Sequence, residues 1–270
     1  MVAVDQLELE SGVGVSPKQT ALILGGSRGL GLATAMKLSK HDHDIVIVHR
    51  DPRSLLTTFQ ASIATMEANG SRVKTYNLDA SKQHNIDQIT DDLLKDNCNI
   101  SCLVHSISRG NVKPLVADQN RLTDEDLNQT IQVMGVSLHS WVHAIADRGL
   151  FTSRGRVIAF TSAGGRRPYP GYAGVSAAKA VLEALVRSIA LEYSAIGLRV
   201  NAVQAGITDT RSLRAIPGSE DMLLYAEERA LYGRITRPED VADAVYLLTR
   251  PEADWITGTI ITADGGEHLL

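Results

Sequence analysis

The segment YPGYAGVSAAKA, residues 169–180, carries a phenol and an ammonium in one predicted helix. Tyr172 and Lys179 are seven residues apart, nearly two helical turns, so their side chains share a face while their backbones lie about 10 Å apart. Val175 holds the position one turn before Lys179, where an ammonium would lower the pKa of a phenol and help it to protonate a forming alkoxide. A phenol two turns away stays neutral and can donate to a developing oxyanion. The pair therefore indicates oxyanion stabilisation, with Tyr169 as an alternative donor and a structural Tyr172 as another interpretation.

A glycine-rich turn supplies a second chemical signal. In LILGGSRGLG, residues 22–31, the glycines Gly25, Gly29 and Gly31 follow a predicted strand and open a predicted helix. Without side chains the backbone can approach a pyrophosphate, and the free N–H groups of the helix N-terminus can bind it. The cluster predicts a dinucleotide site, and the alternative is a tight turn without a ligand.

The end of the second predicted strand indicates which dinucleotide would bind. NAD enzymes place an acidic residue about 20 residues after the glycines, whereas a 2'-phosphate requires a cation. Here the strand ends in His49 and Arg50, and Arg28 lies in the glycine turn, so two guanidinium groups can converge on one phosphate. The pattern favours NADPH. In the alternative interpretation both arginines are solvated, or Asp51 pairs with Arg50.

Short apolar runs alternate with amphipathic segments along the chain. Strands are predicted at 20–26, 44–50, 72–79, 100–106, 156–162, 198–206 and 258–266. Helices are predicted at 29–40, 53–69, 82–96, 123–148, 172–195 and 238–248. This alternation predicts a single-domain α/β fold: a Rossmann-like, doubly wound, parallel seven-stranded sheet with helices on both faces.

Two segments do not follow this alternation of strands and helices. Residues 1–17 are predicted to be a flexible N-terminal tail, and residues 18–270 form the predicted Rossmann-fold domain. Residues 207–236 follow the sixth strand, where open sheets of this kind bind ligands, and are a candidate substrate lid.

Composition excludes several classes of function. A net charge of -4 leaves no basic stripe for nucleic acid, and no apolar run is long enough to span a membrane. The two cysteines, Cys98 and Cys102, are too few for a disulfide framework, so we expect reduced thiols in a cytoplasmic protein. His139 and His143 have metal-compatible spacing but no third ligand nearby, so no metal site is predicted. His105 ends a buried strand and is interpreted as a core or supporting residue rather than a catalytic base.

These motifs together resemble the short-chain dehydrogenase/reductase superfamily over residues 19–267. The resemblance lies in the glycine turn and in the segments NLDA, CLVHSIS, FTSAG, YAGVSAAKA, RVNAVQAG and TADGG. It implies that Asp79, with Leu78 beside it, contacts the adenine and that Lys179 binds the nicotinamide ribose. Ser162, 17 residues before Lys179, matches the active-site serine of the superfamily, although an ordinary strand-end serine is the alternative.

Two departures from the usual superfamily pattern narrow the resemblance. The fourth strand continues as His105-Ser106-Ile107-Ser108 instead of Asn-Asn-Ala-Gly, and Val175 replaces the usual tyrosine. Both features occur in the enoyl-thioester reductases, whose Tyr-x6-Lys pair Tyr172 and Lys179 resemble. The C-terminal part is similar to the NADPH-using branch of the enoyl-acyl-carrier-protein reductases.

The resemblance implies a site, partners and an activity. The catalytic residues would be Tyr172, Lys179 and Ser162, and the residues implied to bind NADPH are Gly25, Ser27, Arg28, Gly29, Leu30, Gly31, His49, Arg50, Leu78, Asp79, Ser106, Ile107, Lys179, Gly206, Thr208 and Thr210. The substrate would be an acyl thioester on acyl carrier protein or CoA, and the assembly a homotetramer. A carbonyl reductase with a displaced tyrosine and a non-catalytic nucleotide-binding protein are the alternatives.

Overall fold

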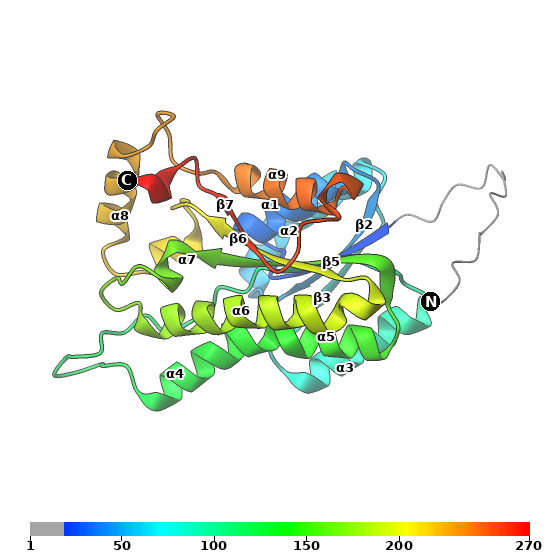
Figure 1. The fold of residues 1–270 in the computed structure, drawn as a ribbon, viewed down its shortest axis with the longest axis horizontal. Helices are drawn as coiled ribbons and strands as arrows, with labels where there is room; N and C mark the ends of the chain where they lie inside the picture. The colour runs from blue at the N-terminus through cyan, green and yellow to red at the C-terminus, as the bar shows by residue number, and fades with distance from the viewer. Residues whose placement is uncertain (1–18) are drawn as a thin grey trace, which may run out of the picture.

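Seven parallel strands form one sheet in the computed structural model, which describes residues 19–270 (Figure 1). The strands are β1 (Gln19–Leu24), β2 (His43–His49), β3 (Val73–Asn77), β4 (Ile100–His105), β5 (Phe151–Ser162), β6 (Arg199–Ala205) and β7 (Ile260–Ala263). Their order across the sheet is β3-β2-β1-β4-β5-β6-β7. The predicted Rossmann-like architecture is therefore confirmed, whereas the predicted tail at residues 1–17 lies outside the described residues.

Helices cover both faces of the sheet (Figure 1). The α-helices of the described residues are α1 (Gly29–Ser39), α2 (Arg53–Ala68), α3 (Gln83–Lys95), α4 (Asp124–Ile131), α5 (Ser137–Asp147), α6 (Ala173–Glu192), α7 (Arg211–Arg214), α8 (Ser219–Glu228) and α9 (Pro238–Thr249). Leu22 and Leu24 of β1 pack in the core beneath α3, α5 and α6, while Ala21 and Ile23 pack in the core beneath α1, α2 and α9. Inner strands such as β1, β4 and β6 are buried on both faces over almost their whole length, as is typical of a parallel sheet covered on both sides.

The predicted helix over 123–148 is wrong in one respect, because a π-helical turn at Gln132–Val136 separates α4 from α5. The hydroxyl of Ser137 donates to the carbonyl of Val133 at 2.7 Å. Gly135 lets the turn approach α6, since a Cβ there would lie 3.0 Å from the Ala178 carbonyl oxygen. π-bulges of this kind are frequent at functional sites, and this one carries part of the cavity wall described below.

The strand order reverses direction at β1, which lies between β2 and β4. The N–H of Gly25 donates to the Val48 carbonyl at 2.8 Å, and the N–H of Ser106 donates to the Leu24 carbonyl at 2.9 Å, so the ends of three strands are tied together. Ligands of open α/β sheets bind at this kind of switch point. Among the described residues, no helix is long and apolar enough to cross a membrane.

Candidate active site

A cavity of about 690 Å³ opens at the carboxyl ends of β1, β2, β4, β5 and β6. Of the residues implied by the resemblance, only Gly31 is absent from its wall. Those that line it are Gly25, Ser27, Arg28, Gly29, Leu30, His49, Arg50, Leu78, Asp79, Ser106, Ile107, Ser162, Tyr172, Lys179, Gly206, Thr208 and Thr210. Residues spread over most of the sequence therefore meet in one site, while the role of each remains a prediction.

The three glycines of the first turn serve different purposes. A Cβ at Gly25 would lie 2.4 Å from the Ser106 carbonyl oxygen, and a Cβ at Gly31 would lie 2.3 Å from the Gly25 carbonyl oxygen. Gly29, at a φ of 51°, meets only the Thr210 side chain at 3.5 Å and borders the cavity. Gly25 and Gly31 therefore allow the backbone to pack closely, whereas Gly29 leaves room for a ligand.

The N-terminus of α1 fits a pyrophosphate. Arg28, at the N-cap, makes no side-chain cap hydrogen bond, and the first turn contains no acidic residue. The first N–H groups of the helix are therefore free of side-chain caps beside a cavity lined by Ser27, Arg28 and Gly29. Such a terminus attracts an anion through both its N–H groups and its dipole.

The two arginines that line the cavity, Arg28 and Arg50, form ion pairs that differ from those considered in the sequence analysis. Asp51 does not pair with Arg50: its buried carboxylate is in contact with Arg28 and lies 3.0 Å from Nδ1 of His49. Arg50 instead pairs with Asp79 at 3.0 Å. Both arginines line the cavity as predicted, and each is already held by a carboxylate.

Tyr172 lies at the N-cap of α6, immediately before the helix begins. Burial raises the pKa of its phenol, while the Ser162 hydroxyl acts in the opposite direction. No full hydrogen bond joins the two side chains, because the buried Ser162 Oγ has no partner among the described residues. Gly164 leaves room for the Tyr172 ring, because a Cβ at position 164 would lie 2.4 Å from that ring. Tyr169 also lines the cavity, edge-on to Tyr172 with 6.2 Å between ring centroids, so the alternative donor remains available.

Lys179 is buried at the base of the same cavity. Its Nζ donates to the carbonyl of Phe160 at 2.6 Å. Burial lowers the pKa of Lys179 to about 8, against the opposing influence of Glu183 one turn further along α6. The pKa of Tyr172 is raised by burial, with further influences from Ser162 and Tyr169. The phenol and the ammonium therefore line one cavity, and the phenol is less acidic than an ordinary tyrosine.

Val175, which lies between Tyr172 and Lys179 in the sequence, forms part of an apolar wall of the cavity. It is buried in a cluster with Val133, Met134 and Ala178, and Tyr172 packs against the cluster. The π-helical turn supplies Val133 and Met134, so the break in the predicted helix shapes the cavity. A wall of this kind suits an acyl chain rather than a charged group.

His105 is buried behind the site and does not line the cavity. Its Nε2 lies 2.8 Å from the Ser137 hydroxyl, and its Nδ1 has no partner among the described residues. Burial, assisted by the charge of Lys179, lowers the pKa of His105 to about 3. A histidine that stays neutral in this way fits the predicted supporting role rather than that of a catalytic base.

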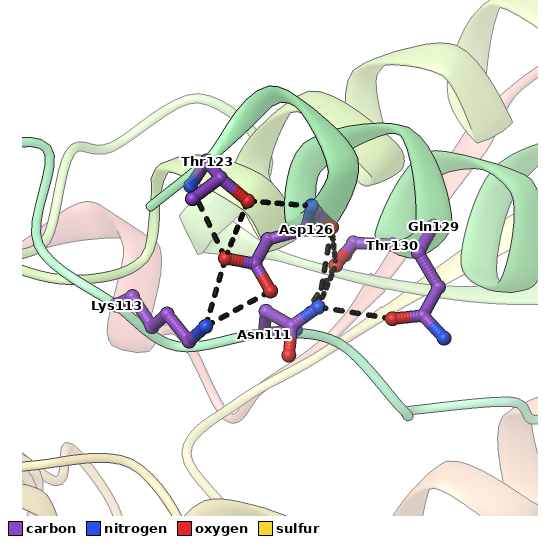
Figure 2. A network of polar contacts seen from close by, with 6 residues as sticks. All are labelled: Asn111, Lys113, Thr123, Asp126, Gln129 and Thr130. Atoms are coloured by element: carbon purple, nitrogen blue, oxygen red, sulfur yellow. Dashed lines mark hydrogen bonds and ion pairs between the residues drawn. The ribbon is translucent and has the colours of Figure 1, made fainter. Parts of the chain in front are cut away.

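Several residues of the cavity wall follow β4 and carry no recognisable motif. Arg109, Gly110 and Val112 line the cavity, and Arg109 reaches Asp79 at 3.5 Å. Figure 2 shows how the next residues are tied to α4: Lys113 pairs with Asp126 at 2.8 Å, and the N–H of Asn111 donates to the Thr130 hydroxyl at 3.0 Å. Their position after a parallel strand is the signal that could have found them, because the carboxyl ends of such strands meet at one edge.

The predicted lid segment contributes another wall. It folds into α7 and α8, and its residues 207–222 border the cavity at several points. The Ser108 and Ser212 hydroxyls lie 2.7 Å apart and link the segment to the loop after β4. The Glu267 carboxylate accepts a hydrogen bond from the N–H of Ile207 at 2.7 Å. Closure of this segment over a ligand remains a prediction.

No cluster of metal-ligating side chains occurs within residues 19–270. His139 and His143 stack with 5.8 Å between ring centroids, and His143 contacts Asp147 at 3.2 Å. Cys98 and Cys102 are free thiols.

Comparison with known proteins agrees with this geometry. Residues 25–268 match the family described as enoyl-(acyl carrier protein) reductase. The chain is 31% identical over 252 residues to a 3-oxoacyl-[acyl-carrier-protein] reductase of Synechocystis sp., covering 92% of this chain and 96% of that protein. It is 26% identical to 1-cyclohexenylcarbonyl-CoA reductase of Streptomyces collinus, over 94% of this chain and 88% of that protein.

A solved structure shares the fold. The enoyl-[acyl-carrier-protein] reductase (NADH) of Aquifex aeolicus superposes with a TM-score of 0.81 at 22% identity, over 95% of this chain and 99% of that one. The family match, the relatives and the cavity lead to one conclusion: the chain belongs to the short-chain dehydrogenase/reductase superfamily of oxidoreductases, which use a nicotinamide cofactor, and resembles its enoyl-acyl-carrier-protein reductases.

Proposed function

We propose that this chain is an NADPH-dependent enoyl-thioester reductase, which reduces the C=C bond of a 2-enoyl group carried by acyl carrier protein or CoA. The observation that carries the proposal is that Tyr172 and Lys179 line one cavity seven residues apart, while Val175, one turn before Lys179, is a buried apolar residue. Carbonyl reduction requires an acidified phenol, yet burial raises the pKa of Tyr172. A neutral phenol suits a reaction in which the charged oxygen is hydrogen-bonded rather than protonated at once.

The residues of the chain divide the work as follows. When bound, the cofactor supplies a hydride to the β-carbon of the enoyl group. Negative charge then develops on the thioester oxygen, and the Tyr172 hydroxyl donates a hydrogen bond to it. The α-carbon takes its proton from solvent or from Tyr172. Lys179 holds a ribose hydroxyl of the cofactor, and its charge stabilises the developing oxyanion.

Different parts of the cavity wall support the proposed substrate and the proposed cofactor. The apolar cluster of Val133, Met134 and Val175 suits the acyl chain, and the name of the Streptomyces relative describes a thioester conjugated to a C=C bond. The positions of Arg28 and Arg50 in the cavity support NADPH over NADH. Action in cytoplasmic fatty-acid or specialised acyl-chain synthesis, as a homotetramer, belongs to the same proposal.

A 3-oxoacyl-thioester reductase is the second candidate, favoured by the similarity to the Synechocystis protein. NADPH oxidation with enoyl and 3-oxoacyl thioesters of equal chain length, each on CoA and on acyl carrier protein, separates the two. We expect the higher kcat/KM with the enoyl substrate. A higher value with the 3-oxoacyl substrate would contradict the proposal, and binding of NADPH without turnover of either would favour a non-catalytic protein.

A further inference from the structure

Asp51 stands at the place where an NAD enzyme keeps its ribose-binding acid, but it is turned out of the cavity. It comes 20 residues after Gly31, the usual distance for that acid. Its side chain is 1% exposed, and it is absent from the cavity wall. Two hydrogen bonds to the Asn77 side chain fix its backbone: the Asp51 N–H donates to Asn77 Oδ1, and Asn77 Nδ2 donates to the Asp51 carbonyl, each at 3.0 Å. Asp51 therefore acts on a ligand only through the side chains that it holds.

His49 is the side chain that stands between this acid and the cavity. Its Nδ1 lies 3.0 Å from the Asp51 carboxylate, and Phe59 fixes the ring edge-on with 4.8 Å between centroids. Nε2 has no hydrogen-bond partner among the described residues, and His49 lines the cavity. With Nδ1–H donating to Asp51, neutral His49 presents a lone pair on Nε2, whereas protonated His49 presents a second N–H.

Charges from all neighbouring elements act on His49. Burial outweighs the opposing influence of Asp51, so the pKa of His49 in the free protein lies below its ordinary value. Arg28, from the turn after β1, contacts Asp51 and lowers the pKa of His49 further. Arg50 follows His49 in the chain and is paired with Asp79, which Arg109 also contacts. The α2 neighbour, Phe59, is uncharged. Asp51 and Asp79 are already paired with arginines. A dianionic phosphate that binds beside His49 would therefore add negative charge, which favours protonated His49.

We infer that the Asp51–His49 pair reads the 2' position of the adenosine ribose and makes the preference between NADPH and NADH depend on pH. Neutral His49 accepts a hydrogen bond from the ribose 2'-hydroxyl of NADH. Protonated His49, with its charge supported by Asp51, donates to the 2'-phosphate of NADPH. Binding of NADPH thus takes up a proton, and the NADPH preference weakens as pH rises. The inference rests on the proposed placement of a nicotinamide cofactor in this cavity.

The test measures dissociation constants of NADPH and NADH from pH 5.5 to 8.5 by fluorescence titration, without substrate. For the wild type we expect the ratio of the NADH to the NADPH constant to fall by up to about tenfold per pH unit within the window where one proton is linked to binding. His49→Asn should give a flatter ratio, because an amide does not titrate. The exposed His84 serves as the control, and His84→Asn should keep the wild-type slope.

The 2'-phosphate of NADPH also ionises in this pH range. Its ionisation affects the wild type and His49→Asn equally, so it cancels when their pH profiles are compared. Asp51→Asn should move the pH dependence to lower pH, because protonated His49 loses its carboxylate. A wild-type ratio that is constant over this range, or an equal slope in His49→Asn, would overturn the inference while leaving NADPH-dependent enoyl reduction intact. Tighter binding of NADH than of NADPH at every pH would contradict the proposed cofactor and the inference together.

Discussion

The two ends of the cavity are built in different ways. The proposed cofactor end rests on backbone packing, in which Gly25 and Gly31 let the ends of β1 and β4 and the start of α1 come together. The proposed catalytic end is assembled from side chains of separate elements, including Met134, Ser162 and Tyr172. We therefore expect the first end to tolerate little change, whereas single side chains can alter the second.

The largest effect that we expect on cofactor binding is at Lys179. Lys179→Met keeps much of the buried volume but removes the charge, so cofactor affinity should fall by about 10- to 100-fold, from loss of a charge-assisted hydrogen bond worth about 1.5–3 kcal/mol, and turnover should fall with it. Thermal stability should not decrease, because burial already disfavours the ammonium. Cofactor titration, steady-state kinetics and calorimetry on one preparation check this. Wild-type cofactor affinity in the variant would show that Lys179 is not a cofactor ligand.

The rigidity of the cofactor end can be tested with two glycines of nearly equal conformation. Gly25 and Gly218 have φ values of 83° and 78°, but a Cβ would clash with the Ser106 carbonyl only at Gly25, whereas nothing lies within 4 Å at Gly218. Gly218→Ala should cost about 1–2 kcal/mol of unfolding free energy, and Gly25→Ala about 1–3 kcal/mol more. Urea denaturation measures both. Equal costs would mean that the strand ends are not packed as described.

The charge of Lys179 also predicts a pH dependence. Because its pKa is lowered to about 8, Lys179 is charged below that pH and neutral above it. Affinity for NADH, whose complex leaves His49 neutral in this range, should therefore be constant between pH 7 and 8 and fall by up to about tenfold per pH unit above pH 8. Glu183 is buried and raises this pKa, so Glu183→Gln should move the fall to lower pH, while the exposed Glu192→Gln should not. Identical profiles for all three proteins would remove Glu183 from this role.

The smallest expected effect concerns the segment 207–236. If it closes over bound ligands, amide exchange in α7 and α8 should slow by about tenfold or less when NADPH and an enoyl thioester are present, because local opening becomes less favourable. Ser212→Ala removes the hydroxyl contact with Ser108 and should speed exchange there in the free protein. Equal protection with and without ligands would show that the segment is a fixed wall and not a lid.

More of the proposed cofactor end than of the proposed catalytic end could be predicted from the sequence. Strand periodicity and the glycine turn predicted the sheet, and the turn identified Gly29 beside the cavity, because both depend on local backbone preferences. The pairing of Asp51 with Arg28 and His49 was missed, since the direction of a side chain after a strand depends on neighbours such as Asn77. The π-helical turn was missed as well, because it arises from tertiary packing against α6 and a local Ser137 bond.

In the proposed reaction, Tyr172 acts as a neutral hydrogen-bond donor to a thioester oxygen. This role is tested by comparing kcat for enoyl and 3-oxoacyl thioesters in the wild type, Tyr172→Phe and Val175→Tyr, with Tyr193→Phe as the control outside the cavity. We predict that Tyr172→Phe lowers enoyl turnover by about 100-fold, the usual cost of losing one oxyanion donor, with cofactor affinity unchanged. Val175→Tyr should gain little 3-oxoacyl activity, because the new ring must enter the apolar cluster with Val133 and Met134. Wild-type enoyl turnover in Tyr172→Phe, or strong 3-oxoacyl reduction by Val175→Tyr, would contradict the account.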